Sequence, residues 1–149
     1  MLNTELVRIF GSIVTFATAV CGVIDAAAGT LCFAGAGGPP PLLLPKDGHP
    51  QWLQTPGTPL GIATGKAFAE LSTTLKPGDR VLVCSDGALE VHNASRDELG
   101  QDGFAAILRE LDYPRTEQRM ERIEEALLKF SNAIRLQDDL TMILLEYVG

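Results

Sequence analysis

Two acidic segments of the chain could bind a metal cation. Ser85-Asp86-Gly87 stands at the end of the apolar run Arg80–Ser85, and Asp138-Asp139 comes directly before a second apolar run. Adjacent carboxylates repel one another, and Mg²⁺ or Mn²⁺, which prefers carboxylate oxygens and water as ligands, would relieve that repulsion. Both segments also have a structural interpretation, since Asp-Gly is a common turn dipeptide and an acid can cap a turn.

Other kinds of site have weaker support in the sequence. The cysteines and histidines are few and scattered: Cys21, Cys32, Cys84, His49 and His92. Without a CxxC pair or ligand spacing they favour neither a disulfide framework nor a zinc site, and we expect a reducing, cytoplasmic setting with the cysteines as small core residues. The Gly-Gly pair within Ala36–Pro41 lacks the following Lys-Ser/Thr of a nucleotide-binding loop.

The charge distribution argues against nucleic-acid and membrane partners. The net charge is −7, and residues 77–149 carry the whole excess of acids. A net acidic chain without a Lys/Arg cluster is a poor binder of nucleic acid or anionic membrane. Residues 9–45 hold a single charge, Asp25, but their short apolar runs and many Gly and Pro residues predict buried strands and no membrane-spanning segment.

The apolar pattern predicts the elements that must position the two acidic segments. The first half favours a short helix followed by strands, and the second half favours helices at a 3.6-residue period before a closing strand. In chain order we expect a helix at 2–10, a strand at 13–24, a turn at 25–29, strands at 30–36, 42–44, 52–53 and 66–75, a turn at 76–79, a strand at 80–85, helices at 104–111 and 120–130, and a buried strand at 140–147. This order predicts an α+β domain, in which Trp52 serves packing.

Taken together, the local motifs resemble a known family. The motifs that carry the resemblance, in chain order, are Phe16–Ala19, Ala34–Pro41, Pro59–Gly61, Leu75–Asp79, Val83–Glu90 with Asn93, Gly100, and Gln137–Thr141. In this order they resemble the SpoIIE-like branch of the PPM-type metal-dependent protein serine/threonine phosphatases, over almost the entire chain.

The resemblance implies a fold and a chemistry. The fold is a four-layer α-β-β-α sandwich, and the activity is hydrolysis of phosphoserine or phosphothreonine on a partner protein by a water that Mg²⁺ or Mn²⁺ activates. By motif position Asp86 and Asp138 correspond to metal ligands, while Asp139, Gly87 and Glu90 correspond to their surroundings. In this branch the partner is typically an anti-sigma factor antagonist.

Two departures from the family pattern leave alternatives open. Gly38 stands where the branch usually has His, and the acidic Gly-Asp-x-x-Gly-x-Gly segment that supplies a metal-bridging Asp has no counterpart before Leu2. Residues 1–149 are therefore interpreted as the C-terminal two-thirds of such a domain. The alternatives are a phosphatase-derived binding module without activity and a fragment with no activity of its own. Missing opening strands would also leave sheet edges exposed and favour self-association.

Overall fold

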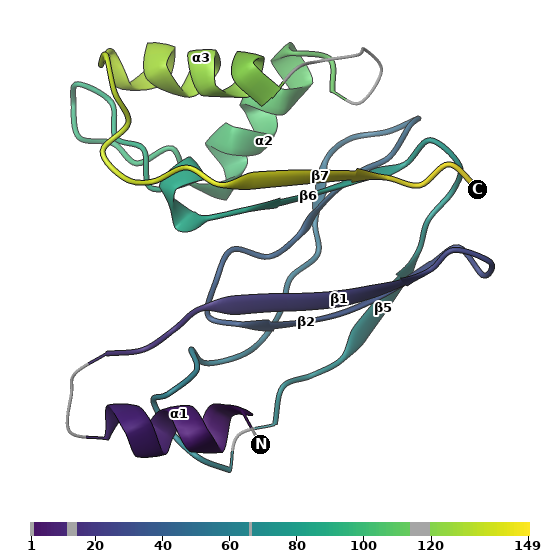
Figure 1. The fold of residues 1–149 in the computed structure, drawn as a ribbon. Coiled ribbons are helices and arrows are strands. Elements are labelled where there is room, and N and C mark those ends of the chain that lie inside the picture. The colour runs from purple at the N-terminus through teal and green to yellow at the C-terminus, as the bar shows by residue number, and fades with distance from the viewer. Residues whose placement is uncertain (1, 12–14, 66, 114–119) are drawn as a thin grey trace. The chain divides into compact units, whose positions relative to one another are not determined.

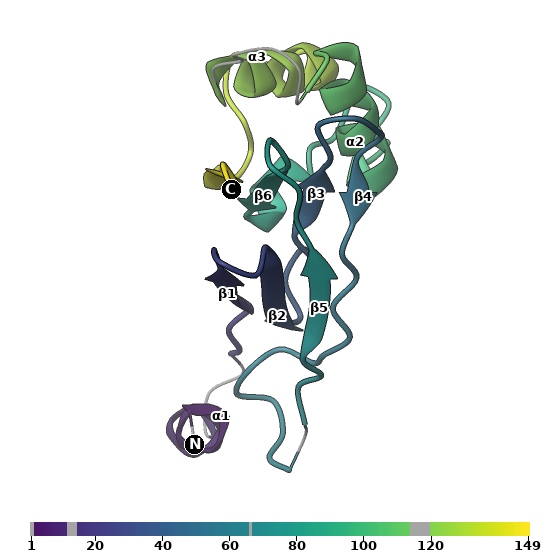
Figure 2. The same ribbon diagram turned by 90° about the vertical axis from the view of Figure 1, so that its right-hand side faces the viewer.

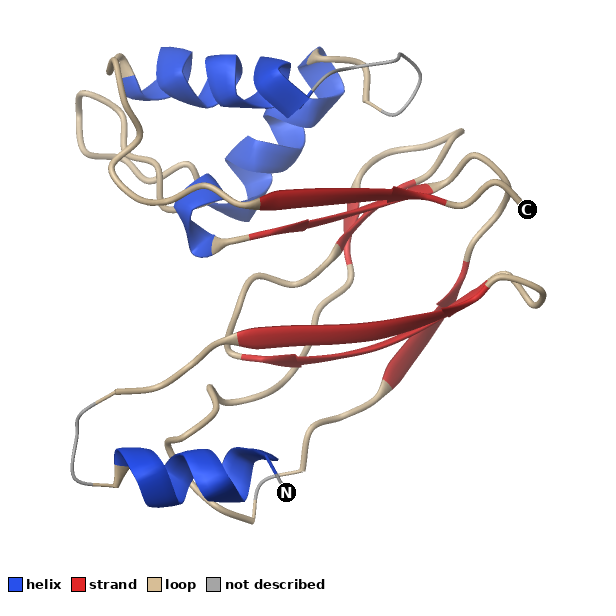
Figure 3. Cartoon of the chain, viewed as in Figure 1, coloured by secondary structure: helices blue, strands red, loops and turns tan. Residues whose placement is uncertain are grey.

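The structure is a computed structural model, and it describes residues 2–11, 15–65, 67–113 and 120–149. The chain divides into two units, which we describe separately. The first unit comprises Met1–Pro40 and Gln54–Leu75, and the second comprises Pro41–Leu53 and Lys76–Gly149. Each contains one antiparallel sheet and at least one helix (Figure 3), which confirms the predicted α+β class.

The first unit is built on a β-hairpin. β1 (Ala19–Asp25) pairs with β2 (Thr30–Ala36), which also pairs with β5 (Leu71–Thr74), and α1 (Leu2–Phe10) lies beside this sheet (Figure 1). At the hairpin turn, the Asp25 carboxylate accepts hydrogen bonds from the N–H groups of the second and third residues after it, at 3.0 and 2.9 Å. Gly29 follows with a φ of +62°, a conformation that glycine adopts without strain, so the predicted turn is confirmed.

β1 is shorter and more exposed than the sequence predicts. Its expected start, at residues 13–14, lies outside the described residues, and pairing with β2 begins only at Ala19. Ala17 instead exchanges backbone hydrogen bonds with Leu60, so this part of the chain leaves the hairpin. The prediction of a buried strand is wrong, since β1 is an edge strand and Val23 is 68% exposed.

β5 is also shorter than the strand predicted at 66–75, whose first residue lies outside the described residues. It pairs only with residues Thr30–Phe33 of β2. Further along β2, Thr55 and Gly57 of the Pro- and Gly-rich segment before β5 lie close to Gly35.

The second unit is a four-stranded sheet covered by two helices. The strand order is β4 (Gln51–Trp52), β3 (Leu42–Leu44), β6 (Arg80–Cys84) and β7 (Met142–Glu146), with antiparallel neighbours throughout. The helices α2 (Gly100–Glu110) and α3 (Met120–Ser131) lie over one face of it (Figures 1 and 2). Their predicted positions are confirmed, and none of the helices in the described part of the chain has the length and apolarity needed to cross a membrane.

The core of the second unit lies between this sheet and its helices. The largest fully buried side chains are Leu42, Leu44, Leu82, Phe104, Leu108, Ile123 and Leu127. Trp52 packs against this cluster with its ring 6.1 Å from that of Phe104, and its indole N–H donates to the carbonyl of Gln101, which confirms its packing role. β7 alternates instead of being buried: Met142 and Leu144 pack on the core, whereas Ile143 and Leu145 are 55% and 43% exposed.

A buried carboxylate fixes the turn before β6. Asp79 is 6% exposed, and its two carboxylate oxygens accept hydrogen bonds from the N–H groups of Lys46 and Lys76, both at 2.9 Å. The predicted turn at 76–79 is confirmed by the N–H of Asp79, which donates to the carbonyl of Lys76, and by a φ of +91° at Gly78. Asp79 thereby ties two loops to the start of the strand that leads to Asp86.

Candidate functional site

Asp86 stands at the carboxyl end of β6, where the strand ends in a single 3₁₀ turn, η1 (Asp86–Ala88). The carbonyl oxygen of Asp86 accepts hydrogen bonds from the N–H groups of Leu89 and Glu90, at 2.8 and 2.9 Å, which closes the turn. The side chain is exposed, and one carboxylate oxygen accepts the N–H of Gly87 at 3.1 Å. The turn therefore fixes the backbone of Asp86 and presents its carboxylate to solvent.

Ser85 joins the end of β6 to the segment that precedes β7. Its backbone N–H donates to the carbonyl of Thr141 at 2.9 Å. Its hydroxyl donates to the carbonyl of Asp139 and accepts the N–H of Thr141, both at 3.0 Å. That this hydroxyl both donates and accepts a hydrogen bond was not predicted. The only signal for it in the sequence is a serine directly before Asp-Gly at the end of a strand.

Gly87 brings the two acidic segments into direct contact. A Cβ atom placed on Gly87 would lie 2.5 Å from the carbonyl oxygen of Asp139 and 3.6 Å from the carbonyl carbon of Asp138. Real Cβ atoms essentially never approach that closely, so only glycine allows this separation of the two backbones. The structure thus places Asp86 and Asp138 on adjacent loops at one end of the β6–β7 pair.

Asp138 and Asp139 are both exposed. One carboxylate oxygen of Asp138 accepts the N–H of Asp139 at 2.7 Å, which is the capping interaction that the structural interpretation expects. No hydrogen bond or ion pair with a described residue engages the other oxygen. The capping bond therefore leaves half of this carboxylate, like half of that of Asp86, free to bind something else.

The side chains of Glu90 and Asn93 form no hydrogen bond with Asp86 or Asp138 in the described part of the chain, although the backbone N–H of Glu90 donates to the carbonyl of Asp86. The Glu90 carboxylate is exposed, while its backbone carbonyl lies 2.9 Å from Nδ1 of His92. The Asn93 side-chain oxygen accepts the N–H groups of Ser95 and Asp97, both at 2.9 Å, and thus closes a surface loop. Asn93 and His92 have local structural roles here.

The cysteines differ in environment. Cys84 is buried in the core beneath Asp86, and burial together with the negative charge of Asp86 raises the pKa of its thiol to about 11. Cys32 is half-buried, and Cys21 on the edge strand β1 is exposed. The prediction that all three are core residues is therefore wrong for Cys21.

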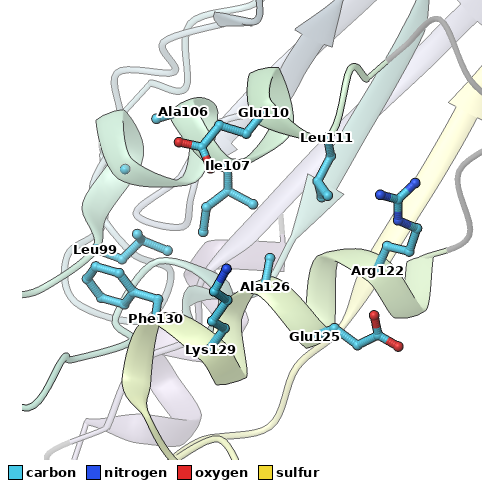
Figure 4. A pocket seen from close by; sticks show the side chains of 11 residues that line it. Leu99, Ala106, Ile107, Glu110, Leu111, Arg122, Glu125, Ala126, Lys129 and Phe130 are labelled. Carbon is cyan, nitrogen blue, oxygen red and sulfur yellow. The ribbon is translucent and has the colours of Figure 1, made fainter.

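Gly38 and two grooves of the structure are not part of the acidic cluster. Gly38 belongs to the first unit, where a Cβ atom on it would lie 3.3 Å from that of Thr18. One groove, of about 510 Å³, is lined by α1 and the hairpin of the first unit. The other, of about 650 Å³, lies between α2 and α3 (Figure 4). Neither groove is lined by Asp86 or Asp138.

The donor set of the acidic cluster fits a hard cation in type but is small in number. Two exposed carboxylates on touching loops are oxygen donors, as Mg²⁺ and Mn²⁺ prefer. Among the described residues, no group of three or more His, Cys, Asp or Glu side chains could hold a metal ion. Two carboxylates alone are fewer oxygen ligands than either cation takes.

The comparison with protein families identifies the family of this chain. The family model described as "Stage II sporulation protein E (SpoIIE)" matches residues 1–148. The chain belongs to the SpoIIE family. The resemblance predicted from the motifs is thereby confirmed, and this SpoIIE-family chain is homologous to PP2C-type serine/threonine phosphatases.

Solved structures show the same fold. The SiaA-PP2C domain of Pseudomonas aeruginosa matches with a TM-score of 0.78 and 20% identity, over 97% of this chain and 57% of that one. The RsbU and RsbW domains of Rv1364c from Mycobacterium tuberculosis match with a TM-score of 0.68 and 26% identity, over 94% of this chain and 39% of that one. The fold is thus that of PP2C phosphatase domains.

A curated relative is much longer. Protein IcfG of Synechocystis sp. is 25% identical over 143 residues, which are 96% of this chain and 22% of IcfG. The SpoIIE-family chain therefore spans about a fifth of this relative and little more than half of the SiaA-PP2C chain.

Proposed function

We propose that this chain takes part in metal-dependent hydrolysis of phosphoserine or phosphothreonine on a partner protein. Asp86 and Asp138 would be the metal ligands, with Asp139, Gly87 and Glu90 around them. The observation that carries the proposal is the contact of Gly87 with the Asp138-Asp139 backbone, because it joins acids that are more than fifty residues apart in the sequence. A capping role alone does not require that contact.

Mg²⁺ or Mn²⁺ is the proposed cofactor. A bound cation of this kind supplies an activated water and neutralises charge on phosphoryl oxygens. The chain's own residues would hold the cation with the free carboxylate oxygens, while the hydroxyl of Ser85 keeps the two loops in register. RsbX, which shares this fold with a TM-score of 0.58 and 18% identity, has been crystallised in complex with magnesium, and this supports the choice of cation.

The proposed substrate is a phosphorylated signalling protein, of the anti-sigma factor antagonist class, in the cytoplasm. The match to a protein that combines RsbU and RsbW domains supports a role in signalling. We further propose that residues 1–149 correspond to the C-terminal two-thirds of the phosphatase domain, which the 57% coverage of the SiaA-PP2C chain supports. An in-frame Gly-Asp-x-x-Gly-x-Gly segment upstream of Met1 in the gene would be the expected finding.

Hydrolysis of p-nitrophenyl phosphate in the presence of Mn²⁺ tests the proposed activity. We expect turnover that requires Mn²⁺ and that Asp86→Ala or Asp138→Ala abolishes, with an unchanged circular dichroism spectrum as the control for folding. Full activity in either variant would overturn the assignment of these residues.

A second candidate function is a binding module without phosphatase activity. It is favoured by the small donor set, since no group of three or more His, Cys, Asp or Glu side chains among the described residues could hold a metal ion, and by Gly38 in place of the usual histidine. Calorimetric titration separates the two functions. Absence of Mn²⁺ binding at millimolar concentration, together with capture of the phosphorylated partner, would favour the binding module. Absence of both would favour a fragment with no activity of its own.

A further inference from the structure

The loop between α3 and β7 carries an exposed arginine beside the acidic cluster, which comprises Asp86, Asp138 and Asp139. Arg135 precedes Asp138 by three residues, which span at most about 11 Å when fully extended. The chain also bends between them, so their Cα atoms are closer than that limit. Arg135 is the only basic residue within five sequence positions of any aspartate of the cluster.

Both ends of this loop are held in place. At its start, the N–H groups of Asn132 and Ala133 donate to two carbonyls in the last turn of α3, each at 3.3 Å, and Asn132 has a φ of +52°. These bonds and the left-handed residue form a Schellman motif, which satisfies the last carbonyls of a helix. Three residues before the end of the acidic segment, Leu136 packs against the core of the second unit. Arg135 therefore lies between two fixed points.

The guanidinium of Arg135 is available to a ligand. The residue is exposed, and its side chain forms no hydrogen bond or ion pair in the described part of the chain. Ile134 beside it is 95% exposed, so no described segment covers this part of the loop. The fold itself therefore makes no use of this positive charge.

The charge of Arg135 is opposite to that of the proposed substrate. A phosphoserine or phosphothreonine side chain carries about −1.5 to −2 charges at pH 7. The three aspartates of the cluster repel it, and a single divalent cation leaves one of their charges uncompensated. A guanidinium adds a fixed positive charge and can donate two parallel hydrogen bonds to phosphate oxygens. Over a distance comparable with the Debye length, about 8 Å at physiological ionic strength, this attraction is only partly screened.

We propose that Arg135 binds the phosphate group of the phosphoprotein substrate and so favours phosphorylated over unphosphorylated protein. This inference rests on the proposed function and adds to it a substrate-binding residue. Because Arg135 carries no metal-ligating atom, its contribution is to the affinity for the phosphate and not to the binding of the cation.

Fluorescence anisotropy with the full chain and a labelled peptide tests the proposal without catalysis. The peptide carries a phosphonate analogue of phosphoserine, which keeps the three phosphoryl oxygens but has a carbon–phosphorus bond that hydrolysis does not cleave. Its counterpart carries serine at the same position. With Mn²⁺ present, we expect the wild type to bind the phosphonate peptide at least about tenfold more tightly than the serine peptide.

Three variants locate this preference. Arg135→Ala should weaken binding of the phosphonate peptide by about tenfold and leave binding of the serine peptide unchanged. Arg135→Lys should recover part of the loss, because lysine keeps the charge but lacks the planar fork. Arg109→Ala removes an exposed arginine from the last turn of α2 and should bind both peptides like the wild type.

Two outcomes would overturn the proposal. One is equal binding of the two peptides by the wild type. The other is unchanged binding of the phosphonate peptide by an Arg135→Ala variant that keeps its circular dichroism spectrum.

Mn²⁺-dependent hydrolysis of p-nitrophenyl phosphate in the same preparations separates this proposal from the proposed function. Turnover by the wild type, together with full phosphonate binding by Arg135→Ala, would support the function and refute the role of Arg135. Absence of turnover, together with phosphonate binding that depends on Arg135, would refute the function and support the role of Arg135.

Discussion

At the residue scale, the two acidic segments meet because of the small side chains between them. Ser85 uses one hydroxyl as both donor and acceptor across to Asp139 and Thr141. Gly87 allows the backbones to touch where any other residue would hold them apart. The acids were evident in the sequence, but their meeting depends on pairing of β6 with β7, which no local pattern specifies.

Gly87→Ala tests whether this contact forms the site. The added methyl group would lie 2.5 Å from the carbonyl oxygen of Asp139, so the loops must separate. Overpacking of this kind costs about 2 kcal/mol in the free energy of unfolding, which urea denaturation measures. We also expect a loss of Mn²⁺ affinity.

Gly48→Ala is the matched control for this prediction. Its new Cβ atom would lie 3.4 Å from a side-chain atom of Pro45, an ordinary contact, so both quantities should stay unchanged. If Gly87→Ala behaved like this control, the close approach of the two loops would have no importance for the site.

At the element scale, the clearly periodic elements were predictable and their lengths and exposure were not. The hairpin around Asp25, the turn at Asp79 and the helices α2 and α3 follow from turn residues and apolar period. The start of β1 was not predictable because Ala17, just before it, pairs with Leu60 from a distant segment. Burial of β1 and β7 was overestimated because an apolar run does not show which of its side chains face solvent, as Val23 and Ile143 do.

Asp79→Ala tests whether the buried carboxylate fixes the turn before β6. The substitution removes two hydrogen bonds between the buried carboxylate and the N–H groups of Lys46 and Lys76. Hydrogen bonds to a charged group contribute about 1.5–3 kcal/mol each, so we expect a loss of about 3 kcal/mol in the free energy of unfolding.

Urea denaturation of Asp79→Ala should be compared with that of Asp47→Ala. Asp47 is an exposed acid one residue after Lys46, and its substitution should leave the stability nearly unchanged. Equal stability of the two variants would mean that Asp79 does not tie the two loops together.

At the scale of the whole molecule, each of the two sheets has an edge with apolar side chains in solvent. Val23 lies on the edge strand β1, and Ile143 and Leu145 lie on the edge strand β7. Unpaired strand edges with exposed apolar residues favour association. We therefore predict that the isolated chain forms oligomers. In sedimentation velocity, the double variant Val23→Lys with Ile143→Lys should contain more monomer than the wild type. A monomeric wild-type chain would contradict this prediction.

The central claim is that Asp86 and Asp138 form a cation site, and titration of the full chain with Mn²⁺, followed by electron paramagnetic resonance, tests it most directly. The wild-type chain should bind Mn²⁺ weakly, and Asp86→Asn and Asp138→Asn should each lower the affinity by about tenfold or more. Asp102→Asn, which removes an exposed acid from α2, is the control and should bind like the wild type. Equal Mn²⁺ affinity in all four proteins would contradict the account.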